Sequence, residues 1–176
     1  MAVEAAIITP LIVLLFFGIL EFGLLFRSTL TFSNAVRSGV RTAVALPRVD
    51  GYEISTAQAV AAALDGIGDD SVDTLTVYRA DPDSGEPVTG DFDTCSTDCW
   101  RFDWNPATRE FVPIAGTGWP ASEQAACGSE EDTDFLGVHI KGKYSFVTGF
   151  FGVDQTLTER SIMRLEPLPL SAECSP

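Results

Sequence analysis

Four cysteines are the residues of this sequence with the clearest potential chemistry: Cys95, Cys99, Cys127 and Cys174. An even number of cysteines, all placed after a long apolar segment, predicts two disulfides in an oxidising compartment, and four cysteines allow three pairings. We expect no free thiol. We also expect at least one bridge from the Cys95–Cys99 segment to Cys127 or Cys174, because a bridge between Cys95 and Cys99 closes too short a loop to constrain the chain much.

Metal binding is the alternative interpretation of these and other polar residues. Cys95 and Cys99 could form half of a zinc site, but the other cysteines are scattered and His139 lies near neither of them. The acidic stretches 81–86 and 130–134 carry oxygen ligands that calcium prefers, without the ligand spacing of a known calcium loop. A hairpin turn and a solvated acidic loop explain them more simply. We expect no bound metal and no cofactor.

Residues that would support catalysis are few. His139 alternates with Val138 and Ile140, which predicts that it projects from one face of a strand. The sequence contains no G-x-S-x-G, H-E-x-x-H or phosphate-loop motif. We expect a protein without enzymatic activity.

Two carboxylates and a proline mark the nearly unbroken apolar run from Ala5 to Phe26: Glu4 precedes the run, Pro10 lies inside it and Glu21 lies near its end. Carboxylates inside a membrane are costly and usually paired or functional. The alternative for Glu21 is a side chain that simply reaches toward the interface. Pro10 removes one helical hydrogen bond. These residues predict a helix that can kink and that offers an acid to a neighbouring chain.

The apolar run is long enough to cross a membrane. As a helix it would extend about 33 Å, against a hydrocarbon core of roughly 30 Å. A cleavable signal peptide would have a shorter apolar core, preceded by basic residues and closed by a small-x-small site, whereas the nearest such triplet is 43–45. A buried core helix is the other alternative. We predict a retained, single-pass membrane anchor.

The helical pattern continues beyond the apolar run. Apolar residues recur at spacings of three and four as far as Val44, and Pro47 ends the pattern. We therefore predict one long helix over residues 1–46, apolar all round in its first half and amphipathic in its second. Residues 47–176 are numerous enough to form a domain with its own core.

Charge is distributed unevenly along the chain. The whole chain carries a net charge of −14, residues 1–46 contribute +1, and residues 47–176 therefore carry −15. This acidity argues against a nucleic-acid partner. Arg27, Arg37 and Arg41 follow the anchor and nothing basic precedes it, although basic residues normally stay cytoplasmic. A basic N-terminal leader removed from the precursor would reconcile this charge pattern with an extracytoplasmic, disulfide-bonded domain.

The sequence after Pro47 predicts an α+β domain. One Ala-rich segment followed by glycines predicts a short helix, and several segments rich in β-branched or aromatic residues predict strands. We expect an antiparallel sheet with one short helix packed on it. The helix is expected at Ser55–Leu64 and the strands at Val72–Ala80, Trp100–Trp104, Arg109–Pro113, Leu136–Phe146 and Gln155–Leu165.

Short motifs at both ends of the chain resemble a known family. The N-terminal motifs are, in chain order, Ala2–Ala6, Thr9–Leu11, Phe17–Gly23 and Asn34–Arg41. Their order resembles the TadE/TadG-like pilin-related proteins of the tight-adherence (Tad/Flp) pilus apparatus. The segment Thr156–Pro167 is similar to the closing strand of actinobacterial members.

The resemblance implies a pseudopilin or minor pilin in the cell membrane, which can be drawn into a pilus or secretion apparatus. A prepilin peptidase would remove a basic leader from the precursor, and the N-terminal helix would assemble with other pilin-like subunits and the assembly platform. Glu4, Pro10 and Glu21 are the assembly residues this implies. Pilins place a glutamate fifth after the cleavage site, and the matching Glu4 is fourth from Met1. A stand-alone anchored binding or adhesin domain is the alternative function.

Overall fold

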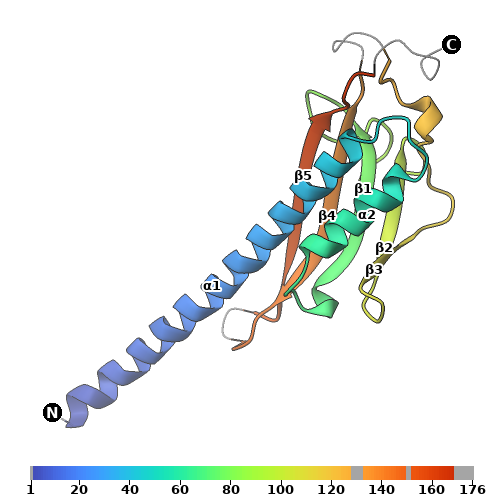
Figure 1. Cartoon of the computed structure of the whole chain (residues 1–176). Coiled ribbons are helices and arrows are strands. Elements are labelled where there is room, and N and C mark those ends of the chain that lie inside the picture. Colours follow the sequence, from blue (N-terminus) through green and yellow to red (C-terminus); the bar gives the residue numbers. More distant parts are fainter. Residues whose placement is uncertain (1, 128–132, 150–151, 169–176) are drawn as a thin grey trace.

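The fold combines one very long helix with a five-stranded antiparallel sheet (Figure 1). The computed structural model describes residues 2–127, 133–149 and 152–168. The helices are α1 (Ala2–Val44) and α2 (Tyr52–Ala63), and the strands are β1 (Val72–Ala80), β2 (Cys99–Asn105), β3 (Glu110–Pro113), β4 (Phe135–Ser145) and β5 (Asp154–Arg164). The predicted α+β class is confirmed, as are the expected helices and strands, to within a few residues at their ends.

The sheet has the strand order β3-β2-β1-β4-β5, and every neighbouring pair is antiparallel. The β4–β5 pair is the longest, since its register runs from Phe135 opposite Arg164 to Ser145 opposite Asp154. Strand β1 is central because it pairs with both β2 and β4. The later β4–β5 hairpin therefore extends the sheet on the side of β1 opposite to the β2–β3 hairpin.

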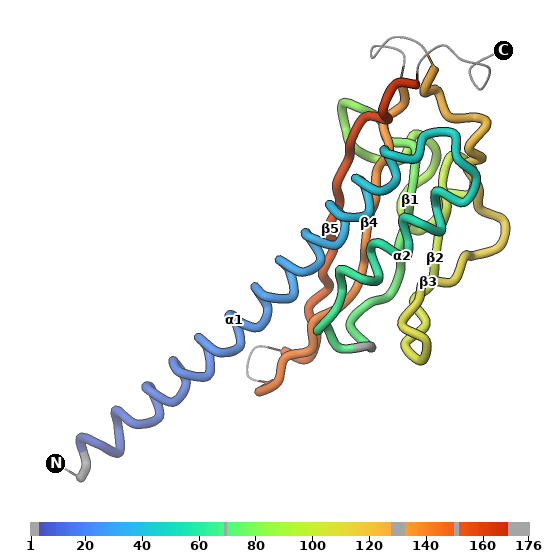
Figure 2. Tube along the Cα trace, in the orientation of Figure 1, coloured from blue at the N-terminus to red at the C-terminus, as the bar shows by residue number. Residues whose placement is uncertain are grey.

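Helix α1 belongs to two environments. Its C-terminal half packs against β4, β5 and α2, whereas its N-terminal half extends away from the sheet (Figures 1 and 2). The helix continues without interruption through Pro10, and the hydroxyl of Thr9 donates a 2.6 Å hydrogen bond to the carbonyl of Ala5. The predicted long helix is thus confirmed. The division of the chain at residue 46 stays a prediction, because the second half of α1 is part of the core of the sheet domain.

The main core lies between the inner face of the sheet and the two helices. Alternate residues of the central strands point into it, as the period of two in a strand requires. Its members that are no more than 1% exposed include Phe32, Val36 and Val40 of α1, Val60 of α2, and Leu75, Val77, Phe102, Leu136, Val138 and Ile140 of the sheet. Because α1 supplies part of this core, the sheet domain cannot bury its apolar surface without that helix.

Gly39 allows α1 and α2 to approach each other closely. A β-carbon at this position would collide with the fully buried Val60 side chain of α2, and would also meet Thr56 and Val138 at 3.5 Å. Gly23, in the exposed half of the same helix, has no atom within 4 Å of the corresponding point. The two glycines therefore form a matched pair for measuring the importance of this helix contact.

We predict that Gly39→Ala destabilises the folded domain by about 1–2 kcal/mol, because overpacking against a β-branched neighbour outweighs the higher helix propensity of alanine. Gly23→Ala should leave stability unchanged or slightly higher. Thermal unfolding of the full chain in detergent micelles measures both. Equal melting temperatures for Gly39→Ala and wild type would contradict the close-packing role of Gly39.

Candidate functional site

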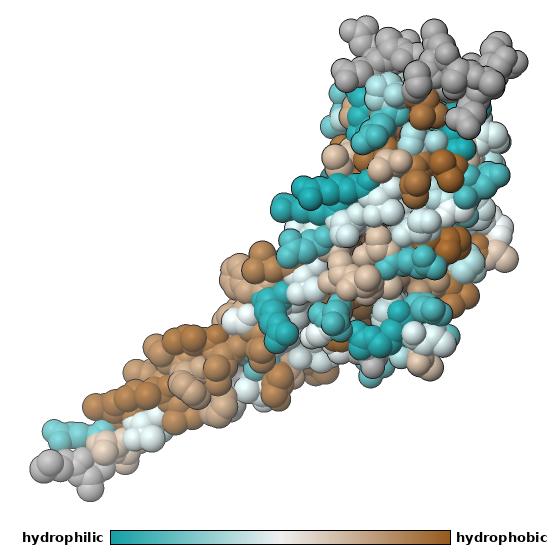
Figure 3. All heavy atoms as spheres, viewed as in Figure 1, coloured by the Kyte–Doolittle hydropathy of each residue, from teal (hydrophilic) through white to brown (hydrophobic). Residues whose placement is uncertain are grey.

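The N-terminal half of α1 presents an apolar surface to its surroundings (Figure 3). Its large apolar side chains between Ile7 and Phe26 include many that are 37% to 72% exposed. The helix has the length and composition needed to cross a membrane. A core helix of a soluble protein would bury these side chains, so their exposure favours contact with lipid or with other apolar helices.

Glu21 is the exception in this exposed half, because only 1% of its surface is exposed. One carboxylate oxygen, Oε1, accepts a short hydrogen bond from the backbone N–H of Val147, and Oε2 accepts one of 3.2 Å from the N–H of Thr148. Both donors lie in the β4–β5 loop, more than 120 residues away in sequence. Glu21 therefore fastens this loop to α1.

Tyr144 strengthens the same contact. Its hydroxyl donates a 3.5 Å hydrogen bond to the backbone carbonyl of Glu21, and its ring packs edge-on against Phe146 with the ring centres 5.3 Å apart. Burial, and then the neighbouring Glu21 carboxylate, raise the pKa of Tyr144, so its hydroxyl stays protonated and able to donate. The contact thus joins the Glu21 side chain and backbone carbonyl of α1 to Tyr144 near the end of β4 and to Val147 and Thr148 of the loop that follows.

Within its own chain Glu21 has partners that the sequence did not suggest, and its expected role in assembly stays a prediction. The sequence suggested an acid offered to a neighbouring chain, or one extended toward the interface, but the carboxylate is occupied by backbone donors of its own chain. Sequence patterns could not reveal this, because any residue can supply a backbone N–H. The physical reason for the contact is that a buried carboxylate needs hydrogen-bond donors.

Glu4 and Pro10 lie in the exposed N-terminal half of α1. Glu4 lies in the first turn of the helix and its side chain is exposed, and Pro10 lies one and a half turns further along. The structure brings neither of them to Glu21. Their expected role in assembly stays a prediction.

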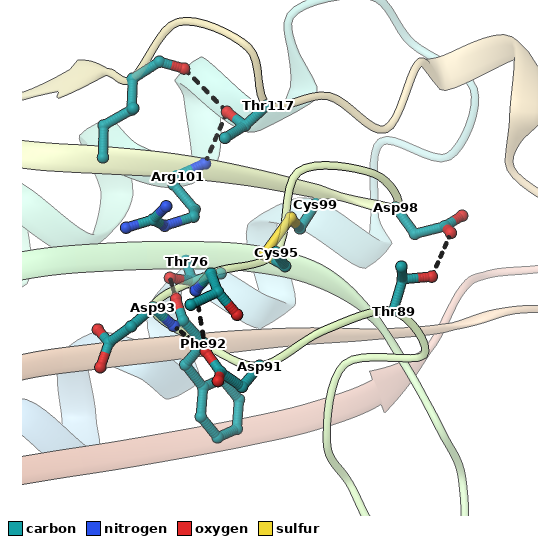
Figure 4. The surroundings of a disulfide bond; sticks show 12 residues. Thr76, Thr89, Asp91, Phe92, Asp93, Cys95, Asp98, Cys99, Arg101 and Thr117 are labelled. Atoms are coloured by element: carbon teal, nitrogen blue, oxygen red, sulfur yellow. Dashed lines mark hydrogen bonds between the residues drawn. A yellow bond between two sulfur atoms is a disulfide. The ribbon is translucent and has the colours of Figure 1, made fainter.

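The cysteine prediction is partly wrong. Cys95 and Cys99 form a disulfide with each other, with their Cα atoms 6.3 Å apart, so this segment is not bridged to Cys127 or Cys174 (Figure 4). Cys127 is also disulfide-bonded, and Cys174 lies outside the described residues. The bridge forms locally because the chain turns back between the two cysteines, with Asp98 in the left-handed region at φ 58°. It also excludes the zinc half-site.

The disulfide supports a segment, residues 81–98, that covers the outer face of the sheet. Cys95 and Cys99 belong to a second apolar cluster with Tyr78 and Ala80, against which Phe92 packs. The carbonyl of Phe92 accepts a 3.0 Å hydrogen bond from the Thr76 hydroxyl. The Phe92 ring meets that of Tyr78 edge-on at 5.3 Å. The outer face of the sheet therefore has its own small core.

The acidic stretch 81–86 forms the predicted turn. Asp81 accepts hydrogen bonds from the backbone N–H groups of Asp83 and Ser84 and from the Ser84 hydroxyl, at 2.8–3.1 Å. The bonds from Ser84, followed by that from Asp83, lower the pKa of Asp81. Of the second stretch, residues 130–132 lie outside the described residues, and Asp134 forms a 2.9 Å ion pair with Arg79. Within the described ranges, no three His, Cys, Asp or Glu side chains gather as metal ligands would.

His139 projects from the outer face of β4, as its alternation with apolar neighbours predicted. It is 6% exposed and stacks on Phe92, with ring centres 4.0 Å apart and planes 14° from parallel. Its buried Nδ1 atom has no hydrogen-bond partner. Burial lowers the pKa of His139 to about 4; Asp93 opposes this shift, while Lys141 and Arg160 add to it. His139 is thus a neutral packing residue of the outer cluster.

Comparison with known families agrees with the N-terminal motifs. Residues 1–41 match the family model described as TadE-like protein. Over most of α1 the chain is therefore similar to TadE-like proteins. No curated protein and no solved structure matches the chain. The family match ends within α1, so the likeness of Thr156–Pro167 to actinobacterial members stays a prediction and the role of the sheet has to be argued from its own contacts.

We predict that Glu21→Ala increases the hydrogen-exchange rates of the Val147 and Thr148 amides at least about tenfold and lowers stability by about 1–2 kcal/mol, because two partly buried backbone donors lose their acceptor. Glu21→Gln should have a smaller effect, since one amide oxygen can still accept. Glu4→Ala is the control and should leave both amides protected. Hydrogen exchange of the full chain in micelles measures this, and unchanged exchange in Glu21→Ala would contradict the contact.

The buried His139 predicts a specific pH dependence. The unfolded chain protonates this residue near pH 6.5 and the folded chain only near pH 4, so the free energy of unfolding should fall as the pH falls through this window, by about 3 kcal/mol. His139 is the only histidine in the sequence. In His139→Phe, which keeps an aromatic stack, this component should disappear while carboxylate titration remains. Parallel stability–pH curves for the two proteins would contradict the prediction.

Proposed function

We propose that this chain is a membrane-anchored, pilin-like structural subunit, a pseudopilin or minor pilin of a Tad/Flp-type pilus or secretion apparatus. The single observation that carries the proposal is the form of the TadE-like helix. Its first half is apolar and exposed, while its second half is built into a folded domain. Such a helix can hold a subunit in the membrane and later pack against equivalent helices when the subunit leaves the lipid.

The exposed half of α1 has a surface suited to helix packing. Gly18 lies among large apolar neighbours and leaves a shallow hollow between Leu14, Leu15 and Phe22. Small residues allow helices to approach closely in membranes. In the proposed assembly, apolar side chains of other pilin-like subunits or of the assembly platform occupy this face. Glu4 lies beyond it and pairs with a basic group, such as the terminal amine, of an adjacent subunit.

The proposed topology places the sheet domain outside the cytoplasm. The Cys95–Cys99 disulfide fits an oxidising compartment. The acidic composition suits a solvated domain. Arg27, Arg37 and Arg41 alone would favour a cytoplasmic sheet domain. A basic leader on the precursor, later removed by a prepilin peptidase, would favour the opposite, extracytoplasmic orientation. In this proposal the sheet domain is the part of the subunit that projects from the membrane, and its surface also takes part in adhesion.

Glu4→Ala tests the proposal directly. We expect it to reduce the yield of crosslinks to other pilin-like subunits in the native envelope by about tenfold, because a desolvated ion pair contributes about 1.4 kcal/mol or more. Membrane insertion should be unchanged. Glu123→Ala, which removes an exposed carboxylate from the sheet domain, is the matched control. Wild-type crosslinking in Glu4→Ala would remove Glu4 from assembly, and no crosslinks from wild type would contradict the subunit role.

A further inference from the structure

The two carboxylates of α1 limit where a bilayer can lie. Between Glu4 and Glu21 there are 16 residues, Ala5–Leu20. They span about 24 Å as a helix, whereas the hydrocarbon core is roughly 30 Å thick. Tilting the helix would shorten this span further. If α1 crosses a bilayer, one of the two carboxylates therefore lies within the hydrocarbon core.

Glu21 is the carboxylate equipped for that position. It is 1% exposed and accepts hydrogen bonds from the backbone N–H groups of Val147 and Thr148, so its charge does not face lipid. The large side chains that follow it also belong in lipid, because Phe22 and Phe26 are 47% and 68% exposed. The outer limit of the hydrocarbon thus falls near Phe26, about 7 Å beyond Glu21 along the helix.

The depth of Glu21 in the membrane also sets the depth of the first residues of the β4–β5 loop. Because Val147 and Thr148 donate to the Glu21 carboxylate, they lie at the same level along α1. Two side chains that flank this loop are apolar and highly exposed: Val147 at 77% and Val153 at 78%. The N–H of Phe146 donates a 2.9 Å hydrogen bond to the carbonyl of Val153.

We propose that the β4–β5 loop is a second membrane contact, in which Val147 and Val153 enter the outer interface of the lipid bilayer beside α1. The inferred depth of about 7 Å lies within the 5–10 Å that interfacial segments reach. The proposal rests on the membrane-spanning role of α1 proposed above. It gives Glu21 a positioning role: its carboxylate satisfies backbone donors that would otherwise enter the interface without partners.

The polar surface next to the loop fits a headgroup level. A hollow of about 210 Å³ lies between α1, the residues that precede β1 and the end of β4. Arg27, Ser28 and Ser71 line it together with Val147. Arg27 directly follows the apolar run, where arginine side chains reach lipid phosphates. Moving outward along α1, apolar side chains at the level of the hydrocarbon are thus followed by polar side chains at the level of the headgroups.

Fluorescence quenching by lipid tests the proposal on the full chain. Val147→Cys and Val153→Cys are each labelled with an environment-sensitive fluorophore and reconstituted at low protein density into phosphatidylcholine–phosphatidylglycerol vesicles. The vesicles contain a lipid that carries a nitroxide quencher near the headgroup end of its acyl chain. Val88→Cys, an exposed valine of the 81–98 segment, is the matched control. We expect loss of most of the fluorescence at positions 147 and 153 and no loss at position 88.

A probe at Leu15→Cys, in the exposed middle of the apolar run, separates the two proposals. Quenching at position 15 without quenching at 147 and 153 would overturn the loop contact and leave the membrane-spanning function standing. No quenching at position 15 would overturn both. Protection of the loop probes from lipid quencher and from iodide in the buffer would place a protein partner on the loop, and would also overturn the proposal.

Discussion

The packing of the second half of α1 against the sheet is the interaction on which the other features depend. Phe32, Val36 and Val40 lie in the main core between α2 and the strands, and Gly39 allows the helices to meet. The same helix continues unbroken into its exposed apolar half. Since a continuous helix is stiff, the direction of the exposed apolar half is fixed relative to the sheet domain. In the proposed assembly, such a subunit would move as one body when its N-terminal helix changes partners.

Glu21 lies where these two environments meet. An isolated carboxylate in an apolar segment would be expensive, but here it accepts hydrogen bonds from two backbone donors of the β4–β5 loop. The arrangement satisfies both sides, because the two loop amides also need an acceptor.

The outer face of the sheet is organised separately from the inner face. Phe92 packs on Tyr78 and His139, and the Cys95–Cys99 bridge fixes the turn that brings the 81–98 segment over the strands. This cluster is small, and its members come from nearby positions on β1, β2 and the connection between them, or from β4. The surface that the sheet domain presents away from α1 therefore depends on local turns and a local disulfide, whereas the inner face depends on the long helix.

The helices, the strands and much of their environment could be predicted from the sequence. Periodicity indicated α1, α2 and the strands because alternation and helical spacing are local properties, and the N-terminal motifs indicated the TadE-like resemblance. The partners of residues far apart in the chain depend instead on how these elements pack together. Cys95 bonds to Cys99, and the spacing of the cysteines does not reveal the turn geometry at Asp98 that allows this bond. Glu21 accepts hydrogen bonds from the backbone N–H groups of Val147 and Thr148. Almost any residue can donate a backbone N–H, so a pattern of residue types could not predict the Glu21 contact.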